Sequence, residues 1–153
     1  MKERTLIIIK PDALQRNLIA DIISRFEKKG LKLVGMKMMS IGDALVREHY
    51  AHHVDKPFFT DLKTFMQSSP VIVMVWQGIE AVRICRQLIG ATSGRKADIG
   101  TIRGDLSNSG SRNIVHGSDS VETAEVEIKR FFHDDELFDW NKTDVGHIYA
   151  PDE

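Results

Sequence analysis

The chain has 153 residues, 42% of them hydrophobic and 28% charged, and a formal net charge of −1. This length predicts a single domain over residues 1–153. The balanced charge argues against nonspecific binding to nucleic acid or anionic membranes, although a local basic cleft remains open. The single cysteine, Cys85, excludes a disulfide framework and a cysteine-rich zinc site. With no apolar run long enough for a leader or a membrane helix, we expect a cytoplasmic protein.

The first residues predict a buried strand followed by a helix. Leu6–Ile9 is a continuous apolar run that Lys10-Pro11 ends, because proline lacks the N–H that a sheet needs and favours an extended residue before it. Such a strand would deliver Lys10 to the end of a sheet. Over residues 19–26 the apolar side chains recur at helical spacing, and Gly30 marks the end of that helix.

The middle of the chain predicts a strand, two short helices, another strand and a helix. The even-numbered residues of 34–38 are apolar and alternate with other types, as in a half-buried strand. Residues 43–66 resemble two short helices that Pro57 interrupts. Residues 71–76 form a second continuous apolar strand, and the apolar stripe of residues 82–89 predicts a further helix.

The last third begins with an irregular segment. Residues 91–112 are rich in Gly, Ser and Thr, and an irregular stretch of this length in a compact domain is either functional or disordered. Residues 114–116 predict a short strand. A helix over residues 121–131 follows, and an N-cap at Asp119 would place Glu122 in a capping box.

Together these elements predict an α+β fold of the ferredoxin-like, split βαβ kind, with helices packed on a four-stranded antiparallel sheet. The most apolar strands, the first and the third, belong in the middle of the sheet. A doubly wound parallel sheet fits less well, because a proline interrupts the segment between the second and third strands.

His116 is the strongest candidate for chemistry. It ends a predicted strand, just before Gly117 and a helix start. Helix N-termini favour phosphate, and a neutral imidazole can attack phosphorus near pH 7. From position alone, a hydrogen-bonded structural histidine explains the same residue. No P-loop motif and no G-x-G-x-x-G motif is present, so nucleotide binding would depend on side chains.

Three cations could meet around His116: Lys10, Arg86 and Arg103. Phosphoryl transfer needs such cations because negative charge spreads over the phosphoryl oxygens in the transition state. Thr92 and Asn113 could add neutral hydrogen bonds. Each cation taken alone is equally consistent with a solvated basic residue.

Aromatic and histidine pairs offer weaker signals. Phe58 follows Pro57 and could stack on a base, although an aromatic there is more often part of the core. His49 and His53 have the i, i+4 spacing of a two-histidine metal face. No third ligand is evident, so a solvent-exposed helix face explains them better. Cys85 lies on an apolar stripe and is expected to be buried.

Several sequence blocks resemble the nucleoside diphosphate kinase family. The two strongest are Thr5–Asp12 and Arg112–Ser120, and the second contains the specific pattern N-x-x-H-G-S-D. Glu48–Tyr50, Lys56–Phe59 and Gly100–Asp105 also match. These blocks keep the family's order and spacing from about residue 5 to residue 140.

The resemblance implies a ferredoxin-like fold and a reversible ping-pong reaction. A nucleoside triphosphate, typically ATP, would give its γ-phosphate to His116, and a nucleoside diphosphate would then take it. The family pattern implies these roles: Lys10 on the transferred phosphate and the sugar 3′-hydroxyl, Tyr50 in orienting the site, Arg86, Thr92 and Arg103 on the phosphates, Asn113 on the sugar, Phe58 with Leu62 on the base, and Ser118 and Glu127 in holding the imidazole.

The resemblance also implies Mg²⁺, bound mainly by nucleotide phosphates with Asp119 near it through water. If the base is held by stacking, the enzyme would accept purine and pyrimidine, ribo- and deoxyribonucleotides. Residues 91–112 would shape the nucleotide cleft and help to pack subunits. The tail, residues 141–153, is similar to the longer tails of hexameric members, so we expect a homohexamer and not a tetramer.

Three differences from the family pattern concern base binding, loop rigidity and subunit packing. Residues 93–99 lack the usual Asn-Pro and the proline before Gly-Thr-Ile-Arg. Gly110 stands where an apolar residue usually covers the second side of the base, and Ser111 replaces a usual glycine.

Three rival functions remain to be weighed. A catalytically silent nucleotide-binding module would not need a nucleophile. A nucleic-acid-binding domain is disfavoured by the near-neutral charge and the lack of an RNP1-type aromatic run, so no nucleic-acid partner is expected. A metal-binding protein would depend on His49 and His53.

Overall fold

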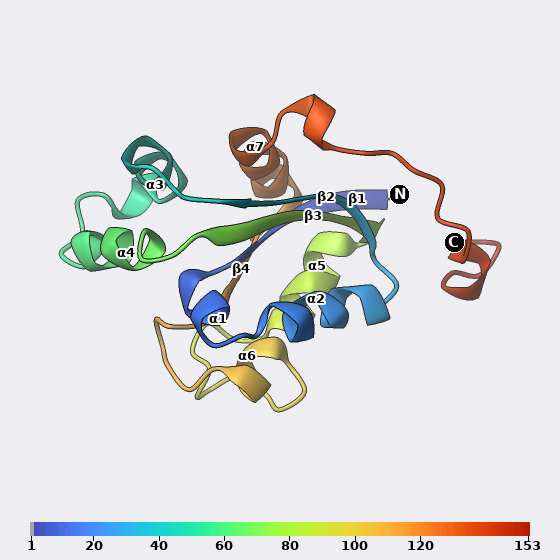
Figure 1. Cartoon of the computed structure of the whole chain (residues 1–153). Helices are drawn as coiled ribbons and strands as arrows, with labels where there is room; N and C mark the ends of the chain where they lie inside the picture. The colour runs from blue at the N-terminus through green and yellow to red at the C-terminus, as the bar shows by residue number, and fades with distance from the viewer. Residues whose placement is uncertain (1) are drawn as a thin grey trace.

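The computed structural model describes residues 2–153. Its four-stranded sheet has the order β2-β3-β1-β4, and each neighbouring pair of strands is antiparallel. This confirms the predicted α+β architecture (Figure 1). The elements are β1 Lys2–Ile9, α1 Pro11–Gln15, α2 Ile19–Lys28, β2 Lys32–Met39, α3 Asp43–His49, the 3₁₀ turn η1 Ala51–His53, α4 Phe59–Met66, β3 Val71–Ile79, α5 Ala81–Ile89, α6 Ile102–Leu106, β4 Val115–Gly117, α7 Val121–Phe131, and the 3₁₀ turns η2 Asp134–Glu136 and η3 Val145–His147.

The sheet is covered on both faces, and the side chains of β1 alternate between the two cores. Ile7 and Ile9 pack with residues of α1, α2, α5 and α6, whereas Leu6 and Ile8 pack with residues of α3, α4 and α7. Figure 1 shows the first set of helices on one side of the sheet, with α3 and α7 on the other. Because these four apolar side chains of β1 are fully buried, each contributes about 1.5–3 kcal/mol of hydrophobic stabilisation. This burial explains the continuous apolar run.

The strand β2 corrects one sequence expectation. A β-bulge between Leu33 and Gly35 places Val34 and Gly35 opposite the same region of β3, so the alternation shifts by one residue. Val34 is buried, but Met36 and Met38 are 52% and 61% exposed. Beyond the bulge, Met36 and Met38 therefore point to the opposite face of the sheet from Val34.

Two short helices were not expected from the sequence. Helix α1 begins at Pro11, where the missing N–H costs nothing because the first turn of a helix has unpaired N–H groups. Helix α6 lies inside the segment 91–112 and begins after Thr101, whose side chain accepts a hydrogen bond from the N–H of Gly104. The segment is therefore partly helical.

The N-cap of α7 is one residue later than expected. Ser120 caps the helix, and its side chain accepts a hydrogen bond of 3.1 Å from the N–H of Thr123. The expectation of Asp119 as the cap is wrong, because Asp119 is directed to Arg86. Among residues 2–153, none of the helices has the length and apolarity that a membrane crossing requires.

Candidate active site

The predicted nucleophile lies in a cleft of about 880 Å³. His116 is the central residue of β4 and pairs with Ile8 of β1, so its side chain shares the face on which α3 and α7 pack. The turn before it has an unusual backbone, since Ile114 has φ of 62°. Asp12 accepts a hydrogen bond from the N–H of Ile114, and the N–H of Lys10 donates to the Ile114 carbonyl. These two contacts hold a conformation that a β-branched residue rarely adopts.

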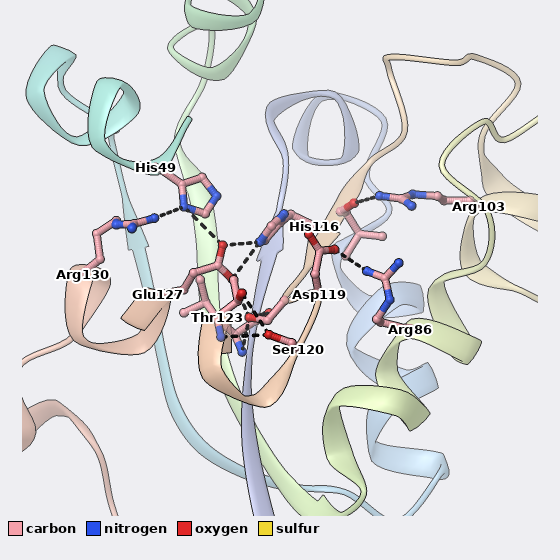
Figure 2. Close-up of polar contacts among 12 residues, drawn as sticks. His49, Arg86, Arg103, His116, Asp119, Ser120, Thr123, Glu127 and Arg130 are labelled. Carbon is pink, nitrogen blue, oxygen red and sulfur yellow. Dashed lines mark hydrogen bonds and ion pairs between the residues drawn. The ribbon is translucent and has the colours of Figure 1, made fainter. Parts of the chain in front are cut away.

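One nitrogen of His116 is held by a carboxylate. Its Nε2 lies 3.2 and 3.1 Å from the two carboxylate oxygens of Glu127 (Figure 2). Ser118 donates a hydrogen bond of 2.5 Å to Oε1 of Glu127. Burial opposes the ionisation of Glu127, but the hydrogen bonds from His116 and Ser118 outweigh it and lower the pKa of Glu127. A carboxylate can only accept, so Nε2 carries the proton.

The other nitrogen, Nδ1, makes no hydrogen bond within residues 2–153. In the Nε2–H tautomer, this atom keeps its lone pair. The arrangement of Glu127, His116 and Ser118 therefore leaves one nucleophilic nitrogen in the cleft.

Lys10, Arg103 and Asn113 form a connected polar wall of the cleft. Nζ of Lys10 donates to Oδ1 of Asn113 over 2.8 Å, and Nδ2 of Asn113 donates to the carbonyl of Thr92 over 2.9 Å. The guanidinium of Arg103 donates to the carbonyls of Gly90, Asn113 and Val115. These contacts bring together four of the predicted phosphate- and sugar-binding residues.

Burial makes the two inner cations easier to deprotonate. Desolvation, followed by repulsion from Arg103, lowers the pKa of Lys10 to about 8. Desolvation, followed by repulsion from Arg86, lowers the pKa of Arg103 to about 10. A polyanion bound in the cleft would reverse both effects by stabilising the charged forms.

The outer cation has a different environment. Arg86 donates a hydrogen bond of 2.7 Å to Oδ1 of Asp119, and their side chains are 51% and 79% exposed. The pair lies at the cleft wall, between α5 and the start of α7 (Figure 2). Asp119 therefore binds the guanidinium of Arg86 through Oδ1, while its Oδ2 could accept a further hydrogen bond.

The predicted base-binding residues lie near the cleft but do not line it. Phe58 precedes α4, is 49% exposed, and places its ring 5.1 Å from the ring of His53, which does line the cleft. Leu62 packs one turn later against the core. Tyr50 lines the cleft, and its hydroxyl is buried without a hydrogen-bond partner within residues 2–153. Burial raises the pKa of Tyr50.

Sequence reasoning missed His49. We expected it on a solvent-exposed helix face with His53, but it is only 6% exposed, and its ring centroid lies 4.8 Å from that of His116. Helix α3 ends at His49, so the two histidines do not share a helix face. The sequence signal that could have indicated burial was the apolar Val46, one turn earlier on the same helix face. Val46 is fully buried in the structure.

The donor atoms of the cleft decide which metal ion it could hold. Within residues 2–153, one group of three donors lies close together: His49, His116 and Glu127. Two imidazoles do not suit Mg²⁺, which prefers oxygen ligands and is often held by substrate phosphates with one or two carboxylates. The exposed carboxylate of Asp119 fits that second arrangement.

Comparison with known proteins shows which family the chain resembles. The family model described as nucleoside diphosphate kinase matches residues 3–137. The chain is 54% identical to the nucleoside diphosphate kinase of Parabacteroides distasonis over 151 residues, which cover 99% of each chain. It is 52% identical to that of Staphylococcus saprophyticus, over 96% of this chain and 99% of the relative.

Solved structures show the same likeness. A nucleoside diphosphate kinase from Halobacterium salinarum in complex with CDP superposes with a TM-score of 0.94 at 50% identity, over 97% of this chain and 99% of that chain. A family protein from Babesia bovis gives 0.93 at 46% identity, over 96% and 99%. The chain belongs to the nucleoside diphosphate kinase family.

Proposed function

We propose that His116 carries the phosphoryl group in a reversible, two-step transfer of the γ-phosphate from a nucleoside triphosphate to a nucleoside diphosphate. The observation that carries this proposal is the contact between Nε2 of His116 and Glu127, which leaves Nδ1 free in a cation-lined cleft. Membership of the kinase family supports the same reaction.

In the first step, the lone pair of Nδ1 attacks the γ-phosphorus. The bond from that phosphorus to the β–γ bridging oxygen breaks, and the nucleoside diphosphate leaves with the electron pair. In the second step, a β-phosphate oxygen of another diphosphate attacks the phosphorus of the phosphohistidine, the P–N bond breaks, and its electron pair returns to Nδ1 of His116. Glu127 keeps its hydrogen bond to Nε2–H throughout, which fixes the tautomer and stabilises charge on the ring.

The wall of the cleft supplies the electrostatic part of the catalysis. Lys10 would contact the transferred phosphate and the sugar 3′-hydroxyl, and Asn113, already bonded to Lys10, would contact the sugar. Arg86, Arg103 and Thr92 would bind the phosphate oxygens, on which charge develops. Tyr50, with its buried hydroxyl, would orient these groups.

Base binding would depend on stacking. The exposed ring of Phe58 offers one face, and Leu62 packs beside it. Because every base has a π-face, stacking discriminates weakly, and we expect broad acceptance of bases and sugars. The CDP that the Halobacterium structure holds is consistent with a pyrimidine nucleotide as a substrate.

Mg²⁺ would enter with the nucleotide phosphates, and Asp119 would approach it through water. When bound, Mg²⁺ neutralises phosphate charge. The exposed carboxylate of Asp119 is compatible with this role, because Arg86 contacts only its Oδ1.

We also propose a homohexamer in the cytoplasm. The tail of residues 141–153 is similar to the tails of hexameric relatives, and Cys85 is a buried free thiol, as expected in a reducing compartment. The test of assembly is the solution mass, which should be about six times the 17.3 kDa of one chain.

The transfer is tested with γ-labelled ATP and Mg²⁺. Wild type should gain an acid-labile, base-stable label that a mixture of nucleoside diphosphates removes as the matching triphosphates. The His116→Ala variant should gain none, and the matched control His147→Ala, at an exposed histidine, should be labelled like wild type. Correctly folded wild type without label would exclude the proposal.

A further inference from the structure

His49 lies between the carboxylate that holds the nucleophile and an arginine. Its Nδ1 is 3.0 Å from a terminal nitrogen of Arg130 and 3.6 Å from Oε2 of Glu127. Figure 2 shows the imidazole in this intermediate place, with His116 beside the same carboxylate of Glu127. Both His49 and Glu127 are buried, with 6% and 5% exposure.

The proton positions on His49 follow from its partners. A guanidinium can only donate, so Nδ1 of His49 accepts from Arg130 and carries no proton. The proton of the neutral ring is then on Nε2, which is buried without a partner within residues 2–153. Desolvation, followed by repulsion from His116, lowers the pKa of His49 to about 3, so the ring remains neutral at physiological pH.

This neutral ring keeps Arg130 from the carboxylate. Arginine and glutamate form strong bidentate pairs, and such a pair would use both oxygens of Glu127. Those oxygens already serve His116 and Ser118. Among residues 2–153, Nε of Arg130 has only a 3.5 Å contact with the exposed Glu48 and no hydrogen bond, so little else would restrain the guanidinium if His49 were removed.

We propose that His49 is a positioning residue for the transfer: it accepts the guanidinium of Arg130 and thereby keeps this cation off Glu127, which stays free to hold His116 as the Nε2–H tautomer. The inference rests on the proposed role of His116. It assigns to His49 no contact with the substrate, and it deepens the function of the cleft by explaining how the carboxylate behind the nucleophile is kept available.

Removal of His49 should therefore harm the reaction through Arg130. In His49→Ala, we expect the rate of His116 phosphorylation, measured in a single turnover with labelled ATP, to fall about tenfold. In the double variant His49→Ala/Arg130→Met, which has no guanidinium to bind Glu127, most of that loss should be recovered. The variant His49→Asn, whose Oδ1 stands near the position of Nδ1 and can accept from Arg130, should remain within about threefold of wild type.

A spectroscopic measurement reads the same effect without turnover. In ¹⁵N spectra of histidine-labelled protein, His116 of the wild type should show the Nε2–H tautomer. His49→Ala should show a reduced share of it, and the double variant should regain it.

The results separate this inference from the proposed function. The positioning role of His49 is wrong if His49→Ala is phosphorylated as fast as wild type, or if Arg130→Met does not restore the lost rate. Labelling of wild type would still support the phosphohistidine in either case. If wild type itself takes no label, the proposed function fails first. An unchanged tautomer in His49→Ala would also overturn the inference.

Discussion

The two sides of the cleft differ in how complete they are before a ligand arrives. On the imidazole side, Glu127 and Ser118 are buried and hydrogen-bonded, and each has its partner within the chain. On the nucleotide side, Phe58 and Arg86 are about half exposed. The proposed nucleophile, His116, is thus organised in advance, which would lower the reorganisation needed during the reaction. The exposed ring of Phe58 and the exposed part of Arg86 would instead gain contacts from the substrate.

The largest effect should come from the organised side. Glu127→Gln removes the carboxylate that accepts Nε2–H, and an amide could donate to that nitrogen instead, which would favour the wrong tautomer. We expect the rate of His116 phosphorylation in a single turnover to fall about 100-fold.

The matched control is Glu125→Gln, at an exposed position of the same helix. Equal rates for Glu127→Gln and wild type would show that the organised side contributes little.

The next effect concerns the boundary between the two sides, where Lys10 has a pKa of about 8. In the free enzyme, Lys10 loses its proton as the pH rises through about 8, and the neutral amine no longer attracts phosphate. We expect kcat/KM for the triphosphate to be constant below that pH and to fall toward tenfold per pH unit above it. Bound phosphate stabilises the charged amine, so kcat should fall only at higher pH.

In Lys10→Arg the guanidinium stays charged, so kcat/KM, whatever its value, should not change as the pH rises through about 8. A wild-type profile that stays flat up to pH 10 would contradict the assignment.

The open side should respond through substrate affinity. Phe58→Ala removes the exposed ring that offers a stacking surface, a contact worth about 1–3 kcal/mol per base. With one side of the base in solvent, the lower part of that range applies, and KM should rise about fivefold to tenfold with kcat nearly unchanged.

Phe138→Ala is the control, since Phe138 is also exposed, at 63%, but its N–H donates to Val34 of β2, whereas the ring of Phe58 contacts His53 of the cleft. A loss confined to kcat would place Phe58 on the organised side instead.

The smallest effect on KM should come from adding an apolar side chain on the nucleotide side of the cleft. Among the described residues 2–153, nothing lies within 4 Å of the position that a Cβ of residue 110 would occupy, so the backbone there leaves space for a side chain. If this position faces the base, Gly110→Val should lower KM about twofold to threefold through added apolar contact. Gly146→Val, at another glycine whose Cβ position is open in the described part of the chain and which does not line the cleft, should leave KM unchanged. Matching shifts in both variants would refute the idea.

The sequence was most informative where the type of a residue alone determines its burial or backbone conformation. The apolar runs of β1 and β3 have no alternative to burial, and Pro11 limits the strand before it. The family pattern identified His116 and Glu127 as a pair that the structure brings into contact. Roles toward nucleotide remain predictions that the variants above test.

Features that depend on the partner of a residue could not be predicted. The bulge in β2 arises from its pairing with β3, so the exposure of Met36 was not evident from alternation. His49 is buried because α3 packs near α7, a contact between distant segments. Asp119 and Ser120 are equally good capping types, and the nearby Arg86 decides between them.

The turn at Ile114 has a consequence for the order of assembly. Its two backbone contacts reach Lys10 and Asp12, more than 100 residues earlier in the chain. During synthesis, the first three strands can meet before residue 114 emerges, but His116 cannot reach its place until the short strand β4 pairs with β1. Because β4 is a three-residue edge strand, it is among the segments that open first when the protein is stressed. Catalytic activity is therefore expected to disappear at a lower denaturant concentration than the bulk of the secondary structure.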